Sequence, residues 1–186
     1  MVRTAHFPYD LRMDRTTLAK RIAETALLRG TFTLRSGKTS SFYLDKYLFS
    51  TQADVLHALG PMFAKELAPG TNRLAGAELG GIPLVTTACM ASGLPCVFIR
   101  NQKKEYGTAK QLEGVLNAGD RVTIVEDVAT TGGQALEAAK VIQAQGAQVL
   151  RIVATIDRLE GARQNIEAAG IEFRALFTVQ DLGVTP

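Results

Sequence analysis

Residues 122–134 read Val-Thr-Ile-Val-Glu-Asp-Val-Ala-Thr-Thr-Gly-Gly-Gln, and the fold prediction rests on them. The apolar run at 122–126 predicts a short buried strand. The Thr-Thr-Gly-Gly turn at 130–133 then predicts a sharp change of direction and the start of a helix. A strand, a turn and a helix in immediate succession are the building unit of an α/β fold.

The segments on either side of this stretch repeat the same order of strand and helix. The predicted strands are residues 73–78, 96–100, 122–126, 149–156 and 171–179. The predicted helices between them are residues 82–92, 134–145 and 162–169. The run at 149–156 is almost continuously apolar, which indicates a strand that is buried on both faces. We therefore predict an α/β fold with a mostly parallel twisted sheet flanked by helices, and ligands at the carboxyl ends of the strands.

The N-terminal portion is less regular. Apolar residues spaced three or four apart predict an amphipathic helix over residues 17–29, with Gly30 as the residue that ends it. A second helix is predicted over residues 53–67, and Gly60-Pro61 inside it predicts a kink or a break. No internal repeat, low-complexity tract or linker interrupts the chain, so we expect a single domain over residues 1–186.

Composition and charge argue against several classes of protein. The 186 residues are 46% hydrophobic, and 21 Lys and Arg against 18 Asp and Glu leave a net charge of +3, too small for a dedicated nucleic-acid-binding face. Residues 79–99 are uncharged, but glycines and prolines divide them, so we expect no membrane segment. Cys89 and Cys96 lie in apolar surroundings, which favours free thiols and a cytoplasmic protein.

The residues after the central strand suit a phosphate-binding turn. Backbone N–H groups at a helix N-terminus form a concave donor site for a phosphate, the two threonines add hydroxyl donors, and the two glycines allow close approach. Glu126 and Asp127 would repel the phosphate itself. They would instead accept hydrogen bonds from sugar hydroxyls, or neutralise a cation or a developing positive charge nearby. The same residues could also form an ordinary strand, turn and helix, with the threonines capping the helix and the acids in water.

The whole of residues 122–134 resembles the signature with which type I phosphoribosyltransferases bind phosphoribosyl pyrophosphate (PRPP): hydrophobic-rich positions, two acids, two small residues and TTGG. The resemblance implies that Glu126 and Asp127 hold the ribose 2′- and 3′-hydroxyls and that residues 129–133 wrap the 5′-phosphate. The residues that it assigns to PRPP in this segment are Glu126, Asp127, Val128, Ala129, Thr130, Thr131, Gly132, Gly133 and Gln134.

The implied reaction also fits these residue types. Displacement of pyrophosphate from C1 of the ribose passes through an oxocarbenium-like centre, which nearby anions stabilise, so the resemblance makes Glu126 and Asp127 catalytic. The sequence offers no His/Cys cluster for a transition metal, and we expect no metal site formed by the protein. The implied cofactor is Mg²⁺, carried mainly by PRPP or diphosphate.

Residues 32–45, Phe-Thr-Leu-Arg-Ser-Gly-Lys-Thr-Ser-Ser-Phe-Tyr-Leu-Asp, resemble the hood segment of orotate phosphoribosyltransferases. Aromatic and aliphatic side chains of such a hood can cover a flat base, and the resemblance assigns Arg35 to PRPP. The alternative from the residues alone is an exposed turn around Ser36-Gly37 between two strands.

Residues 100–108, Arg-Asn-Gln-Lys-Lys-Glu-Tyr-Gly-Thr, resemble the mobile loop that closes over pyrophosphate in that family. The resemblance assigns PRPP binding to Arg100, Lys103, Lys104 and Tyr106, and a catalytic role to Lys104. It also implies a homodimer in which the loop at 101–113 reaches the neighbouring site. Two positions depart from the family pattern, because Asn101 replaces a basic residue and Tyr106 stands where His is frequent. Taken alone, such a charged run is usually a solvated face.

Residues 154–162, Ala-Thr-Ile-Asp-Arg-Leu-Glu-Gly-Ala, resemble the D-R-x-E-G-A run of the same family at a strand's carboxyl end. A planar guanidinium can bind a carboxylate through two hydrogen bonds. The resemblance therefore assigns orotate binding to Arg158, with Thr130 touching the base. From the residues alone, Asp157-Arg158 could be a surface turn. The turn at 78–83 resembles the pyrophosphate loop GGIP of one branch of the family.

Together these segments identify the chain as a member of the orotate phosphoribosyltransferase family. The resemblance implies a type I phosphoribosyltransferase fold with a small N-terminal hood: an N-terminal helix and hood at about residues 1–50 and a PRPP-binding core at about 70–180. It implies transfer of ribose 5-phosphate from PRPP to orotate, giving orotidine 5′-phosphate and diphosphate in pyrimidine biosynthesis. The partners expected are these substrates, with no nucleic acid and no membrane. The alternatives are a transferase for another base and a non-catalytic PRPP-binding regulator.

Overall fold

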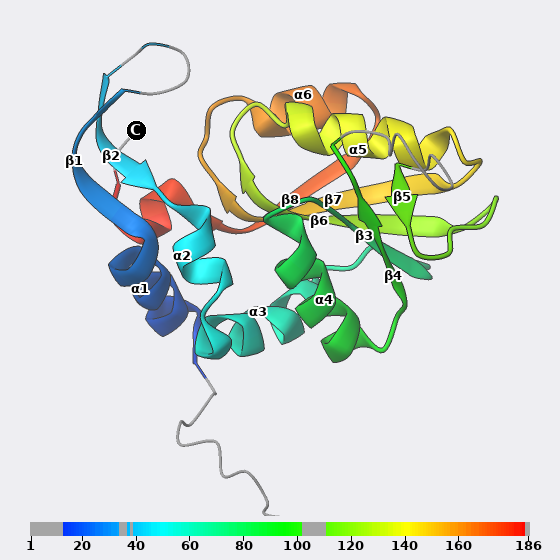
Figure 1. Cartoon of the computed structure of the whole chain (residues 1–186), viewed down its shortest axis with the longest axis horizontal. Helices are drawn as coiled ribbons and strands as arrows, with labels where there is room; N and C mark the ends of the chain where they lie inside the picture. Colours follow the sequence, from blue (N-terminus) through cyan, green and yellow to red (C-terminus); the bar gives the residue numbers. More distant parts are fainter. Residues whose placement is uncertain (1–12, 34–36, 38, 102–110, 185–186) are drawn as a thin grey trace, which may run out of the picture.

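A six-stranded sheet in the order β5-β4-β3-β6-β7-β8 lies at the centre of the computed structural model, which describes residues 13–33, 37, 39–101 and 111–184 (Figure 1). Its strands are β3 (Arg73–Ala77), β4 (Cys96–Ile99), β5 (Leu112–Glu113), β6 (Arg121–Ala129), β7 (Gln148–Asp157) and β8 (Glu172–Thr178). All neighbouring pairs are parallel except β4 with β5. The predicted α/β fold with a mostly parallel sheet is confirmed.

Helices cover both faces of this sheet (Figure 1). One face carries α3 (Ala53–Lys65) and α4 (Gly81–Ser92), and the other carries α5 (Gly133–Gln143) and α6 (Ala162–Ala168). Successive side chains of a strand point to opposite faces, so a strand between two helix layers must be apolar at every position. In β6 the side chains of Ile124 and Val125 accordingly belong to the two different hydrophobic cores.

The N-terminal part begins with α1 (Arg15–Ala26) and continues into β1 (Leu27–Thr33), β2 (Thr39–Leu44) and α2 (Lys46–Ser50). The prediction of a helix over residues 17–29 ended by Gly30 is therefore wrong at its C-terminal end. Residues from Leu27 onward pair as an antiparallel strand with β2, and these ladder hydrogen bonds outweigh the local helical pattern. The β1–β2 hairpin is the small N-terminal hood expected from the resemblance and stands beside the main sheet (Figure 1).

Two further expectations need correction. Of the predicted kink or break at Gly60-Pro61, the break is wrong, because helix α3 continues through Pro61. Gly60 lets α3 approach α4 closely, since a Cβ at Gly60 would lie 2.8 Å from the carbonyl oxygen of Thr87. Strand β6 extends to Ala129, beyond the predicted end at residue 126, because its parallel pairing with β7 continues to that residue. The two acids therefore lie inside the strand.

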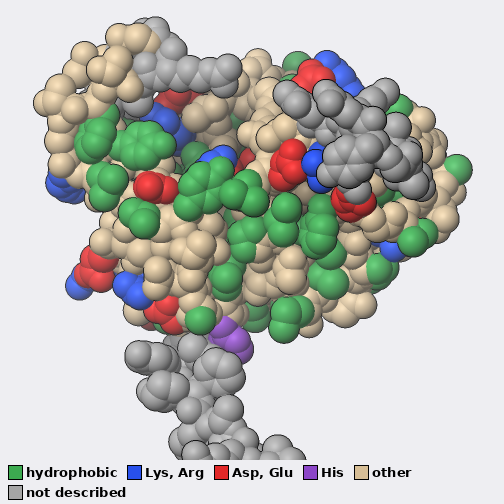
Figure 2. Space-filling view, viewed as in Figure 1, with side chains coloured by type: hydrophobic (Ala, Val, Ile, Leu, Met, Phe, Trp, Pro, Cys, Tyr) green, Lys and Arg blue, Asp and Glu red, His purple; other side chains and the backbone are tan. Residues whose placement is uncertain are grey.

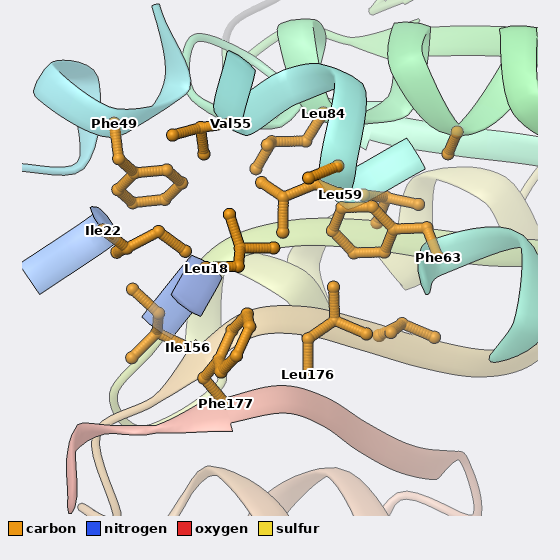
Figure 3. Packing of buried hydrophobic residues seen from close by; sticks show 14 of the residues in the cluster. Leu18, Ile22, Phe49, Val55, Leu59, Phe63, Leu84, Ile156, Leu176 and Phe177 are labelled. Atoms are coloured by element: carbon orange, nitrogen blue, oxygen red, sulfur yellow. The ribbon is translucent and has the colours of Figure 1, made fainter. Parts of the chain in front are cut away.

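The N-terminal helices are fixed to the sheet by a shared apolar core (Figure 3). Leu18 and Ile22 of α1 and Phe49 of α2 are fully buried, and they pack in one cluster with Ile156 of β7 and Phe177 of β8. This packing holds the β2–α2 segment at the carboxyl end of β6 and β7. No helix among the described residues is long and apolar enough to cross a membrane.

Candidate active site

Three loops meet at the carboxyl ends of the central strands. The backbone N–H of Arg158, after β7, donates to the carbonyl of Ala129 at the end of β6 over 2.9 Å. The amide of Gln134, at the start of α5, donates to the carbonyl of Glu78 after β3 over 3.1 Å. The loops after β3, β6 and β7 are thus tied to one another. This is the sheet edge at which an open α/β fold binds ligands.

The Thr-Thr-Gly-Gly turn forms the predicted cradle between β6 and α5. Gly132 adopts the left-handed conformation, with φ of 78°, and a Cβ there would lie 2.9 Å from the side chain of Ile166. Only glycine meets both conditions without strain. No side chain caps the N-terminus of α5, and the amide of Asn165 in α6 holds the carbonyl of Thr131 over 2.9 Å. The first backbone N–H groups of α5 are therefore available to an anion.

Glu126 and Asp127 lie directly before this cradle, and both are buried, with 4% and 2% of their surface exposed. Burial and the neighbouring charge of Asp127 raise the pKa of the Glu126 carboxyl well above its usual range. The Oε2 atom of Glu126 is buried and has no hydrogen-bond partner among the described residues. The interpretation of these acids as water-facing surface groups is wrong, and a buried acceptor without a partner is suited to a hydroxyl donor.

Asp127 is paired with Lys46, a residue that no pattern in the sequence indicated as part of the site. Nζ of Lys46, the first residue of α2, lies 2.8 Å from Oδ2 of Asp127. Burial opposes the charged form of this amine, but the hydrogen bond and charge of Asp127 outweigh burial and raise the pKa of Lys46. The two residues are far apart in the sequence, and no spacing rule connects them, so only the folded chain reveals the pair.

Arg158 lies at the same edge, beyond the cradle. Its guanidinium is 17% exposed, forms a 2.8 Å ion pair with Glu160, and stands over the ring of Phe42 at 5.7 Å. Its Nε is buried and has no hydrogen-bond partner among the described residues. The aromatic Phe42 belongs to β2, so the hood and the loop after β7 meet at this arginine. The guanidinium is positioned to bind an anionic, flat ligand.

Val128 lies in β6 between the acids and the turn, and of the predicted residues outside 126–134 and Arg158 the structure describes only Arg100. Its backbone is paired with Gln111 across the base of the loop, its guanidinium lies 3.8 Å from Glu113, and its Nε is buried without a partner among the described residues. A cavity of about 200 Å³ is lined by Arg100 together with Gln134 of the cradle helix. Arg35, Lys103, Lys104 and Tyr106 lie outside the described residues.

The fold therefore brings together an anion cradle, two buried carboxylates and a guanidinium with an aromatic neighbour. Figure 2 shows charged side chains of both signs between the hood and the main body. Among the residues that the structure describes, no group of three or more His, Cys, Asp or Glu side chains could hold a metal ion. The arrangement can bind a phosphorylated sugar and a planar anion side by side.

No protein-family model matches the chain, but curated proteins do. It is 43% identical to the orotate phosphoribosyltransferase of Natronomonas pharaonis over 153 residues, which is 82% of this chain and 87% of that protein. It is 37% identical to the orotate phosphoribosyltransferase of Methanocaldococcus jannaschii over 175 residues, covering 93% and 99% of the two chains.

Solved structures are also similar to this chain over most of its length. The orotate phosphoribosyltransferase of Mycobacterium tuberculosis superposes with a TM-score of 0.83 at 29% identity, covering 92% of this chain and 100% of that one. The same enzyme has been solved in complex with PRPP, with a TM-score of 0.77. The orotate phosphoribosyltransferase of Aeropyrum pernix superposes with a TM-score of 0.77 at 28% identity, covering 89% of this chain and 95% of that one.

Proposed function

Because the chain belongs to the orotate phosphoribosyltransferase family, we propose that it joins orotate to the ribose 5-phosphate of PRPP, giving orotidine 5′-phosphate and diphosphate in pyrimidine biosynthesis. The observation that carries the choice of base is the position of Arg158. A guanidinium beside an aromatic ring and next to an anion cradle offers a carboxylated flat base both a charged partner and a stacking surface.

The ribose 5-phosphate binds along β6 in this proposal. The 5′-phosphate accepts hydrogen bonds from the N–H groups of residues 130–134, where α5 begins. The 2′- and 3′-hydroxyls donate to Glu126 and Asp127, and the unpartnered Oε2 of Glu126 supports this assignment. Entry of the sugar requires a local opening, since both carboxylates are almost fully covered.

The reaction exchanges one bond at C1 of the ribose for another. N1 of orotate loses its proton and forms the new bond as the C1–O bond to pyrophosphate breaks. The leaving diphosphate takes the electron pair of the C1–O bond, and the proton passes to the diphosphate or to water. Positive charge develops on C1 and the ring oxygen, and the carboxylates of β6 stabilise it. Mg²⁺ enters with PRPP as part of the substrate and neutralises the leaving diphosphate. Arg100 lies at the end of β4, where it can reach that group.

We also propose a homodimer in the cytoplasm, in which Lys103, Lys104 and Tyr106 of the loop at 101–113 act in the neighbouring site, while Arg35 of the hood binds PRPP. Exposed apolar residues at and before α4 support the dimer: Met90 in α4 is 81% exposed, and Leu79, two residues before the helix begins, is 63% exposed. Figure 2 shows hydrophobic side chains gathered over this part of the molecule. A surface of this kind is typical of protein contacts. The free thiols of Cys89 and Cys96 favour a reducing compartment.

The proposed activity is tested by incubating the purified protein with MgPRPP and orotate and following the loss of orotate absorbance. Loss of orotate that depends on PRPP, with no turnover of adenine, guanine or uracil, is the expected result. Turnover of another base in place of orotate would refute the assignment of Arg158. For the shared site, mixing Lys104→Ala with Asp127→Ala chains should restore activity through hybrid dimers, and no restoration would contradict it.

A further inference from the structure

The feature that leads beyond the proposed reaction is the contact between the hood segment and the buried acids. Lys46 lies two residues after the end of β2, and its ammonium group is 2.8 Å from Asp127 in β6. Phe42, four residues earlier, places its ring 5.7 Å from the guanidinium of Arg158. One short segment therefore touches both the carboxylates proposed for the ribose and the arginine proposed for the base.

The position of Lys46 is fixed by its own backbone. The carboxylate of Asp45 accepts a hydrogen bond from the N–H of Tyr47 over 3.1 Å and caps α2. The N–H of Asp45 donates to the carbonyl of Ala26 over 2.9 Å, which ties the start of α2 to the end of α1. With its backbone anchored twice, Lys46 extends its side chain into the site, where 29% of that side chain remains exposed.

The carboxylate of Asp127 is confined on its other side by the turn after β3. A Cβ added at Gly80 would overlap Oδ2 of Asp127, so the acid lies directly against that backbone. The charged groups next to it are Lys46 from α2 and Glu126 from its own strand. Two adjacent buried carboxylates repel each other, and the ammonium group of Lys46 is the positive charge that offsets this repulsion.

We propose that Lys46 is a positioning residue for the ribose subsite, holding Asp127 in the orientation that accepts a sugar hydroxyl. A carboxylate oxygen accepts more than one hydrogen bond, so Asp127 can keep Lys46 and receive a hydroxyl as well. Because Lys46 belongs to the segment that also carries Phe42, movement of the hood changes the ribose and base subsites together. This inference rests on the proposed function, and its test separates the two.

The test compares Lys46→Met, which keeps the length of the side chain without its charge, with Lys46→Arg and with the control Lys20→Met. Lys20 is an exposed residue of α1 whose ammonium group lies 3.8 Å from Glu24, so the control also removes a paired lysine charge. The binding probes are ribose 5-phosphate, which carries the hydroxyls and the phosphate, and inorganic phosphate alone. Their dissociation constants are measured by calorimetry, and melting temperatures show that each variant is folded.

Lys46→Met should weaken ribose 5-phosphate by on the order of 10- to 100-fold, the usual size for losing a hydrogen bond to a charged group. Phosphate should weaken several-fold less. In turnover, KM for PRPP should rise while KM for orotate changes little, and Lys46→Arg should restore most of the loss. Unchanged or tighter binding of ribose 5-phosphate, equal weakening of both probes, or no recovery in Lys46→Arg would overturn the inference. An inactive wild-type protein would refute the proposed function instead, and the binding comparison would still stand.

Discussion

Replacing Arg158 by alanine is the sharpest perturbation of base recognition that the structure offers. The guanidinium is mostly covered, has an unpartnered buried Nε, and is held by Glu160 at 2.8 Å and by the ring of Phe42 at 5.7 Å. Removing it leaves the cradle of residues 130–133 and the carboxylates of β6 intact. The loss should therefore fall on orotate and spare PRPP.

The size of the loss follows from two opposing interactions. A hydrogen bond between charged groups contributes about 1.5–3 kcal/mol. The ion pair with Glu160 must be shared or exchanged when a ligand carboxylate arrives, but the Glu160 side chain is 48% exposed, so its competition is worth about 0.5 kcal/mol. The remaining difference of about 1–2.5 kcal/mol corresponds to a rise of roughly 5- to 70-fold in KM for orotate.

The assay follows orotate absorbance, with each substrate varied in turn while the other is saturating. Arg163→Ala is a matched control, because Arg163 also pairs with a carboxylate, Glu167 at 2.9 Å, and also stands over an aromatic ring, Phe173 at 5.3 Å. Arg163 belongs to α6 and has no part in the proposed site. KM for PRPP should stay within about threefold of wild type in both variants, well below one charged hydrogen bond.

Two results would contradict the role of Arg158 in base recognition. Equal increases in KM for orotate and PRPP would mean that the arginine supports the whole site rather than the base. An increase no larger than that of Arg163→Ala would mean that the ring and ion-pair contacts of Arg158 are structural. The conservative variant Arg158→Lys should recover only part of the affinity, since an ammonium group cannot form the planar pair of hydrogen bonds.

Three further predictions concern the acids and the fold. Because burial and Asp127 hold the pKa of Glu126 above its usual range, the native state binds the proton of this acid more tightly than the unfolded chain does, and the protein loses stability as the pH rises above that usual range. Glu126→Gln should therefore raise the urea midpoint more at pH 7 than at pH 4, while weakening the binding of MgPRPP. Gly80→Ala should lower kcat/KM for PRPP by on the order of tenfold or more, measured by orotate turnover, because the new Cβ overlaps Asp127. The hydrogen bond from Arg15 lowers the pKa of Asp181 to about 2, so this pair stabilises the fold fully at pH values above the ordinary pKa of 3.8 and progressively less as the pH falls toward 2. Asp181→Asn should lower the free energy of unfolding in urea by about 1–2 kcal/mol at pH 7, after allowance for the exposure of the pair.

Each of these has a contrary outcome. A urea midpoint for Glu126→Gln that shifts equally at both pH values would show that the carboxyl titrates normally. Wild-type kinetics in Gly80→Ala would show that Asp127 can move without consequence. A penalty for Asp181→Asn that persists unchanged toward pH 2 would mean that packing, rather than the charge of the pair, links α1 to the C-terminal segment.

The order of strands and helices in the core and the place of the cradle could be predicted from local sequence patterns. A strand between two helix layers is mostly apolar on both faces, so β6 and β7 can be recognised as buried strands from their nearly continuous apolar runs. The turn before α5 could also be predicted, because two successive glycines after a strand mark a sharp turn, and Gly132 adopts a positive φ that favours glycine. Glu126 and Asp127 follow as the acids beside it.

Which side chains from distant parts of the sequence contact those residues depends on the tertiary structure. The pairing of β1 with β2 ended α1 earlier than its own periodicity indicated, since ladder hydrogen bonds between strands outweigh helix propensity. The same pairing carried Phe42 to Arg158 and, through α2, Lys46 to Asp127. Local patterns encode the elements, whereas a buried ion pair depends on where the core places two elements relative to each other. For this reason the cradle could be predicted from one stretch of sequence, whereas the contact of Lys46 with Asp127 could not.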